Sequence, residues 1–269
     1  MALYFGAATG NKMAIGTGAA FTDLTLATVL AWVRPTVWVP TRENNVIAKG
    51  DFADGYWRPC FFSKNASVQG ILGTFCRRGT TTLQTEAHAW TNVTPAADKW
   101  LFVATGYDFT LTDADQWMML GELTVPAEEP SAYDIRRTGS GNYVLTNAGR
   151  TAYVGNSDNA SQVESFVGDI ACLAVYNIRM TPAAARTYQY RPYLWPAHPN
   201  CIGYWQLGLI AAASAQPDWS RGTNDGTVTG ATVSDHVPLG PLFSFDTALP
   251  MIPTPRLVNT SWSGVWQRV

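Results

Sequence analysis

Short hydrophobic runs of about four to eight residues follow one another along the chain, and clusters of Gly, Asn, Asp and Pro separate them. In TVLAWVR at 28–34, alternate side chains form one apolar face and one mixed face, which is the pattern of a strand. In WLFVATGY at 100–107, both faces are apolar, as in a central strand. The same criteria predict twelve strands, at 3–5, 13–15, 28–34, 46–49, 57–63, 70–76, 83–90, 100–107, 116–120, 152–154, 166–176 and 203–207.

One short helix is expected among these strands, at 181–190. Thr181 can cap it, Pro182 suits its first position, and three alanines follow. A dozen strands with almost no helix cannot build βαβ units, because parallel crossovers usually contain a helix. The pattern therefore predicts an all-β fold, either two antiparallel sheets stacked face to face or a closed barrel.

The length of 269 residues fits one large sandwich, since all-β domains often reach about 200–250 residues. We assign residues 1–237 to one domain, which the late strand at 203–207 closes. The alternative is a second, partial domain that begins near 203, but too few residues remain there for another core.

Residues 238–269 differ in composition, with five prolines between 238 and 255. Proline lacks a backbone donor and fixes φ, so this stretch cannot pair inside a sheet. We expect an extended C-terminal arm that docks on its own domain or on a neighbouring subunit. The apolar residues expected to bind the partner are Phe243, Phe245, Leu257, Trp262 and Trp266.

The charge content excludes some classes of function. Charged residues make up 14% of the chain, and the net charge of -2 gives no basic field for nucleic acid. No stretch approaches ~18 uninterrupted apolar residues, and the first residues lack the pattern of a secretory signal, so we expect synthesis in the cytoplasm and no membrane span. The four cysteines are far apart without a CxxC pair, which favours free buried thiols over disulfides.

Several segments resemble, in the right order, jelly-roll domains of the laminin G-like, concanavalin A-like class. They are ALYFGAATGNKMAIG, FTDLTLATVLAWVRPT, NNVIAKGD, DKWLFVATGYD, YVGNSDN and FVGDIACLAVYNIRMTPA, which together span about residues 1–190. GYWQLG and DWSRGTNDGTVTGA, near 203–232, are similar to a further piece of the family. The resemblance implies a two-sheet antiparallel jelly-roll sandwich with one short helix.

Domains of this class include glycoside hydrolases, which need two carboxylates about 5–9 Å apart. The pattern E-x-D-x-x-E of those enzymes is missing, and the nearest acidic groups lie on a predicted proline-containing loop, namely Glu122, Glu128, Glu129 and Asp134. The three histidines lack metal-ligand spacing, and neither a nucleophile elbow nor a phosphate loop occurs. We therefore expect no enzymatic activity.

Calcium is the small ligand that the resemblance implies, since concanavalin-like domains often hold it with loop Asp and Asn oxygens. The positions expected to bind it are Asp158, Asn159 and Asp169. The alternative is that GNSDN is only a turn, because Asn and Asp tolerate left-handed backbone. No other cofactor is expected.

The leading hypothesis is a structural virion protein, made in the host cytoplasm, such as a bacteriophage capsid-decoration or cement protein. It would bind capsid or other virion proteins, and form a homo-oligomer on the particle. Low charge, abundant aromatics and the apolar arm favour it, and the pattern with its GYWQLG ending resembles phage virion proteins. The alternative is a carbohydrate-binding module of a tail fibre or adhesin, in which tryptophans at strand ends stack on sugars. Its predicted glycan-binding residues are Trp38, Trp57, Trp90 and Trp117.

Overall fold

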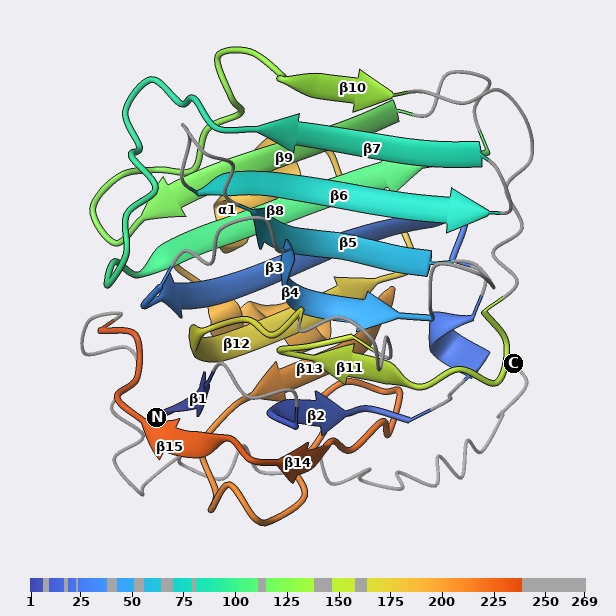
Figure 1. Ribbon diagram of the computed structural model, residues 1–269, viewed down its shortest axis with the longest axis vertical. Helices are drawn as coiled ribbons and strands as arrows, with labels where there is room; N and C mark the ends of the chain where they lie inside the picture. The colour runs from blue at the N-terminus through green and yellow to red at the C-terminus, as the bar shows by residue number, and fades with distance from the viewer. Residues whose placement is uncertain are drawn as a thin grey trace, which may run out of the picture. The chain divides into compact units, whose positions relative to one another are not determined.

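Two antiparallel sheets stack face to face in the computed structural model, and only short helices accompany them (Figure 1). The structure describes residues 1–6, 10–16, 19–22, 24–37, 43–50, 56–63, 70–78, 81–110, 115–137, 147–157 and 164–238. Residues 1–237 form one compact unit. The sandwich predicted from the hydrophobic pattern is confirmed, and the closed barrel is not formed.

The first sheet has seven strands. Its spatial order is β15 (Thr232–Ser234), β1 (Ala2–Phe5), β12 (Gly168–Tyr176), β3 (Leu26–Pro35), β8 (Leu101–Asp108) and β9 (Asp115–Glu122), and β13 (Cys201–Gln206) also pairs with β12. Strands β1 and β13 lie end to end along the same side of β12, because β1 pairs with residues 168–170 and β13 with residues 172–176. The late segment near 203 is therefore part of this sheet.

The second sheet has eight strands. Its order is β10 (Ile135–Arg137), β7 (Thr81–Ala87), β6 (Ile71–Arg78), β5 (Tyr56–Ser63), β4 (Glu43–Lys49), β11 (Ala152–Val154), β2 (Lys12–Ala14) and β14 (Thr227–Thr229). All twelve predicted strands are present, with ends that differ by a few residues. The pattern missed β10, β14 and β15, because strands of three residues carry too little periodicity to be recognised.

The main core lies between the sheets. Val29, Ala31 and Val33 of β3 enter it, as the alternation predicts. The opposite side of β3 is buried as well, because Trp32 packs against Phe102 of β8 and its indole N–H donates to the Gln189 carbonyl at 2.9 Å. Both faces of these central strands are thus apolar and covered.

The helix predicted near 181–190 is present as α1 (Pro182–Tyr188), and the Thr181 hydroxyl accepts from the backbone N–H of Ala184 at 3.2 Å. Two 3₁₀ helices, η1 (Ala19–Phe21) and η2 (Pro192–Ala197), complete the elements of the described residues. α1 and η2 cover the outer face of the seven-stranded sheet, where Trp195 of η2 contacts Phe102. No helix in the described ranges is long and apolar enough to cross a membrane.

All four cysteines are buried free thiols, as the sequence predicts. Burial raises the pKa of the Cys172 and Cys201 thiols to about 12 and that of Cys60 and Cys76 still further. Because the thiolate is the reactive form, these cysteines are inert core residues at neutral pH.

Candidate functional surfaces

The tryptophans predicted to stack on sugars are buried where the structure describes them. Trp57 is fully buried and donates its indole N–H to the Tyr107 hydroxyl at 2.5 Å, while Trp117 donates to the Met180 carbonyl at 2.9 Å. Trp90 is 8% exposed and belongs to the main core. The prediction is wrong for these three residues, because long-range packing covers rings that local sequence places near strand ends. Trp38 lies outside the described residues.

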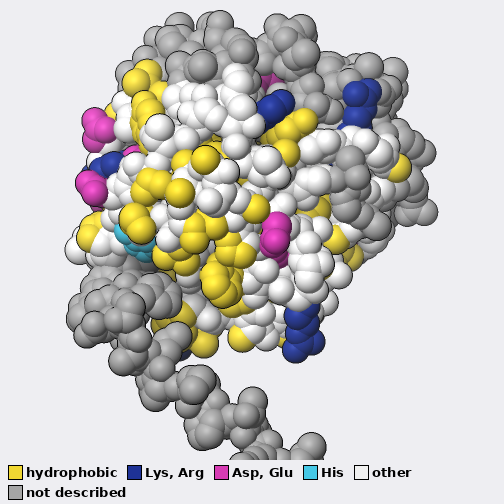
Figure 2. Space-filling model, turned by 90° about the horizontal axis from the view of Figure 1, so that it is seen from below, with side chains coloured by type: hydrophobic (Ala, Val, Ile, Leu, Met, Phe, Trp, Pro, Cys, Tyr) yellow, Lys and Arg dark blue, Asp and Glu magenta, His cyan; other side chains and the backbone are white. Residues whose placement is uncertain are grey.

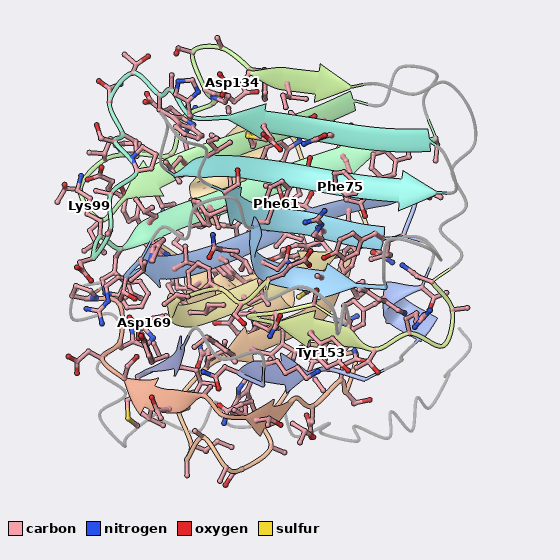
Figure 3. The ribbon with its side chains drawn as sticks, viewed as in Figure 1. Phe61, Phe75, Lys99, Asp134, Tyr153 and Asp169 are labelled. Atoms are coloured by element: carbon pink, nitrogen blue, oxygen red, sulfur yellow. The ribbon has the colours of Figure 1, made fainter. Side chains whose placement is uncertain are left out.

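Asp169, one of the three predicted calcium ligands, already has a partner. Its side chain is 1% exposed on β12, one oxygen accepts from Arg34 Nε at 2.8 Å, and the other accepts from the Ser234 hydroxyl (Figure 3). This carboxylate forms a structural ion pair, and its assignment to calcium stays a prediction. Asp158 and Asn159 fall outside the described residues, and no described group of His, Cys, Asp or Glu could hold a metal.

The five predicted partner contacts of the C-terminal arm also lie outside the described residues. Phe243, Phe245, Leu257, Trp262 and Trp266 therefore stay predictions.

The outer face of the eight-stranded sheet carries a polar and aromatic cluster that the sequence did not single out. Its apolar part consists of Ala48, Tyr56, Phe61 and Phe75, which form a cluster separate from the main core (Figure 3). The Arg58 guanidinium lies 4.0 Å from the Tyr56 ring centre and 4.5 Å from that of Phe75. These are cation–π distances. No periodicity signals this cluster, because a bulge at 58–61 changes which residues share a face.

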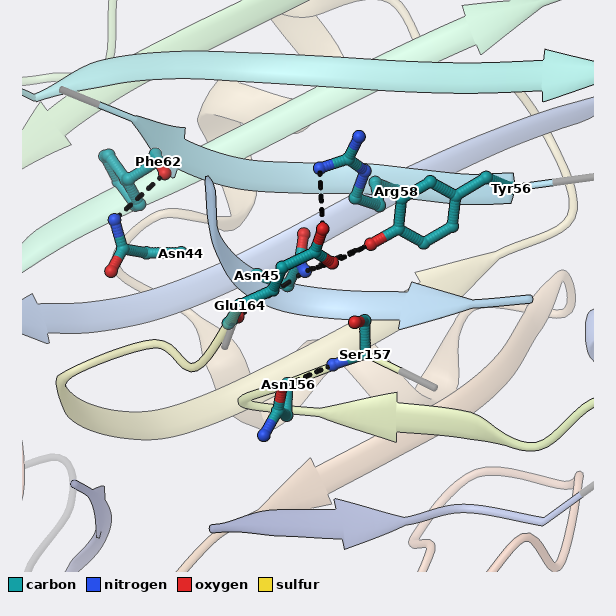
Figure 4. A network of polar contacts seen from close by, with 8 residues as sticks. All are labelled: Asn44, Asn45, Tyr56, Arg58, Phe62, Asn156, Ser157 and Glu164. Atoms are coloured by element: carbon teal, nitrogen blue, oxygen red, sulfur yellow. Dashed lines mark hydrogen bonds and ion pairs between the residues drawn. The ribbon is translucent and has the colours of Figure 1, made fainter. Parts of the chain in front are cut away.

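Glu164 connects the polar groups of this cluster (Figure 4). Its carboxylate accepts from the Tyr56 hydroxyl and from Asn45 Nδ2 at 3.0 Å, and lies 3.9 Å from Arg58 Nη1. Burial, with a further contribution from Glu164, raises the pKa of Tyr56. Burial lowers the pKa of Arg58 to about 10, against the attraction of Glu164. Tyr56 thus stays protonated and Arg58 charged near neutral pH, so the cluster is a buried ion pair rather than an acid–base site.

The acidic residues predicted to be solvated loop groups each have a local partner or face water. Glu122 pairs with Lys99 at 2.7 Å, Asp134 with His88 at 2.5 Å, and Glu128 accepts from Asn92, while Glu129 is exposed. Glu122, Asp134 and Glu128 are thus each engaged by a different neighbour.

An open hollow of about 610 Å³ lies at the β9 edge of the seven-stranded sheet. After β9 the chain turns back, and Leu120 and Glu128 exchange backbone hydrogen bonds of 3.0 and 2.9 Å. The turn forms the floor of the hollow and Arg186 of α1 forms a wall. The lining residues are Asn92, Thr124, Val125, Pro126, Ala127, Glu128 and Arg186.

The opposite edge of the same sheet, formed by β1, β13 and β15, exposes large apolar side chains, and we call it the lower edge. Met1 directly precedes β1, and Val233 lies on β15, which pairs with β1. Ile210 and Trp219 lie on the segment that follows β13. Trp219 is 55% and Met1 52% exposed. Seen from below, hydrophobic side chains spread across this face with only scattered charges (Figure 2).

Comparisons with known proteins show which proteins share this fold. No family model matches the sequence, and no curated protein matches it. A protein from Bacteroides ovatus described as carbohydrate-binding superposes with a TM-score of 0.59 at 14% identity, over 89% of this chain and 61% of that one. The chain has a laminin G-like, concanavalin A-like jelly-roll fold. The resemblance seen in the sequence is thereby confirmed.

Two further similar structures have lower TM-scores. Domains LG4-5 of the mouse laminin alpha1 chain give 0.44 at 14% identity, over 67% of this chain and 43% of that one. The full-length tailspike protein 2 of an Escherichia coli O157:H7 bacteriophage gives 0.48 at 15% identity, over 77% of this chain and 28% of that one. The chain covers less than two thirds of each of these three proteins. At such low identity, the likeness concerns the fold alone.

Proposed function

We propose that this jelly roll is a non-catalytic structural protein of a virion, which attaches to neighbouring subunits through its lower edge and its C-terminal arm. The observation that carries the proposal is the exposed apolar lower edge, with Met1, Ile210, Trp219 and Val233. Exposed apolar groups that gather on one surface favour a protein partner, since burial of apolar area stabilises a complex by about 25 cal/mol per Å² before the costs of association.

The course of the chain after β15 also favours the lower edge as the attachment surface. β15 pairs with β1 at this edge and ends at Ser234, so the chain leaves toward residue 238 from the lower edge itself. We propose that the apolar residues of the arm bind the same partner. A capsid-decoration or cement protein, in several copies on the particle, fits this arrangement.

The chemistry of the described residues agrees with a binding role. Tyr56 and Arg58 of the Glu164 cluster stay in one protonation state near neutral pH, and Glu122 and Glu128 have separate partners. General acid–base catalysis needs a group poised to change its protonation state near the working pH.

The test is incorporation into particles. The double variant Trp219→Ser/Val233→Ser, and separately a deletion of residues 239–269, should each lower the copies per purified virion at least tenfold, measured by quantitative mass spectrometry. Tyr193→Ser is the matched control, because Tyr193 is an exposed aromatic residue on η2. Thermal unfolding should show that the surface variants change stability by no more than about 0.5 kcal/mol. Wild-type copy numbers for both the double variant and the deletion would refute the proposal.

A further inference from the structure

The hollow at the β9 edge is held rigidly from beneath. Gln189, whose side chain is fully buried, donates from Nε2 to the carbonyls of Glu122 and Val125 at 2.7 and 2.9 Å. Its Oε1 accepts from the backbone N–H of Ala127 at 2.6 Å. Gly121 is required beside it, because a Cβ there would collide with Gln189 and with the Ala127 backbone. The floor of the hollow is therefore fixed before any ligand arrives.

The polar groups at the rim are also oriented in advance. The Glu128 carboxylate accepts from the backbone N–H of Asn92 at 2.5 Å and from its Nδ2 at 2.7 Å, which leaves the amide oxygen of Asn92 as an acceptor for another molecule. Arg186 donates from Nε to the Ala127 carbonyl at 2.5 Å, and no described residue takes its two Nη groups. An exposed Thr124 hydroxyl adds a group that both donates and accepts.

This arrangement fits a sugar ring. Fixed donors and acceptors suit vicinal hydroxyls, while Val125, Pro126 and Ala127 offer an apolar floor for the C–H face of a pyranose. Small-ligand sites occupy about 300–1,000 Å³ and combine an apolar lining with a few placed polar groups. The wall carries one carboxylate, Glu128, and one guanidinium, Arg186, so a charged ligand would gain one contact and be repelled by the other group.

We infer that the hollow between Asn92, the 124–128 turn and Arg186 binds a neutral saccharide. This site lies at the edge of the seven-stranded sheet opposite the lower edge, and its role is independent of attachment to a particle. A virion protein with both surfaces would hold its neighbours at one edge and a host or environmental glycan at the other. The glycan-binding residues expected from the sequence were tryptophans at strand ends, whereas this site consists of polar groups around a turn.

The experiment screens the full-length protein on an array of neutral and acidic glycans, and then titrates the best neutral glycan by calorimetry. Arg186→Ala should weaken binding at least about tenfold, since a hydrogen bond to a charged group is lost. Thr124→Val, which keeps the shape of an exposed side chain, should weaken it about two- to tenfold. Arg221→Ala is the matched control, because Arg221 is an exposed arginine of the lower edge.

Each result of the glycan experiment either supports or overturns the proposed site. Binding of a neutral glycan that both hollow variants weaken and the control leaves unchanged supports the site. Binding that neither variant changes overturns it, as does an array on which no neutral glycan binds. If only acidic glycans bind, the assignment of a neutral ligand is wrong. Thr124→Val keeps the test valid if Arg186→Ala fails to fold. Neither hollow variant touches the lower edge, so particle incorporation is judged separately.

Discussion

At both edges of the seven-stranded sheet, a buried glutamine holds a turn in place. The surfaces that the two edges present differ in chemistry. At the β9 edge, buried Gln189 bonds three backbone groups of the 122–127 turn. At the lower edge, buried Gln216 accepts from the Gly208 N–H at 3.1 Å and donates to the carbonyls of Ala211 and Ser214 at 3.3 and 3.2 Å. In each case one side-chain amide makes three hydrogen bonds to the backbone of the turn.

The surfaces that rest on these turns differ in chemistry. The β9 turn supports charged and polar groups around a hollow, whereas the lower edge presents large apolar side chains. At each edge a buried amide holds the backbone of the turn from within, so the exposed side chains at the surface can differ while the turn is kept. We therefore expect that the scaffold and the recognition surface can be changed separately at both edges.

Gln189→Ala should have the largest effect. It removes three hydrogen bonds of 2.6 to 2.9 Å and leaves a cavity among buried groups, so we expect the free energy of unfolding to fall by about 3 kcal/mol. Denaturant unfolding measures this change. Glycan binding at the hollow should fall as well, while particle incorporation stays normal. A loss below about 0.5 kcal/mol, within the range of ordinary surface changes, would contradict the role given to Gln189.

Gln216→Ala should lower the free energy of unfolding by less, about 2 kcal/mol, because the hydrogen bonds of Gln216 are longer and its turn is more exposed. Here particle incorporation should fall and glycan binding should persist. Gln206→Ala serves as the control for both variants, since Gln206 is only partly buried and donates to one side chain, the Tyr204 hydroxyl. If either glutamine variant impaired both functions equally, the two edges would be one coupled unit.

Glu128→Gln should have the smallest effect, and it should depend on pH. Although burial opposes the shift, hydrogen bonds from Asn92 and from neighbouring backbone N–H groups hold the pKa of Glu128 below its ordinary value of about 4.3. A lowered folded-state pKa stabilises the protein above the unfolded value, and this stabilisation is lost as pH falls through the folded-state pKa.

Melting temperatures between about pH 6 and pH 3 should therefore decline less steeply in Glu128→Gln than in the wild type. Glu129→Gln, at the exposed neighbouring position, should keep the wild-type slope. Identical slopes for the wild type and Glu128→Gln would mean that the carboxylate does not orient Asn92 as described.

The sequence predicted the strands and the helix more accurately than the functional surfaces. Strand β3 was readable because its alternation matches the pleat, and α1 because Thr181 and Pro182 are local signals of a helix start. The tryptophan assignments failed because the rings of Trp57 and Trp117 are covered by residues about 50 and 63 positions away. The ion pair of Asp169 was missed for the same reason, since its partner Arg34 lies 135 residues away.

By itself, the sequence determined an all-β chain with one capped helix and free thiols, and the jelly roll was what the resemblance implied. Those features depend on local periodicity, turn residues and spacing, which the chain carries along its length. Only the tertiary structure decided which polar groups meet. Glu164 joins Arg58, Glu128 orients Asn92, and the two buried glutamines fix the turns at opposite edges. Such contacts depend on strand order and bulges, which bring distant residues together and leave no periodic trace in the sequence.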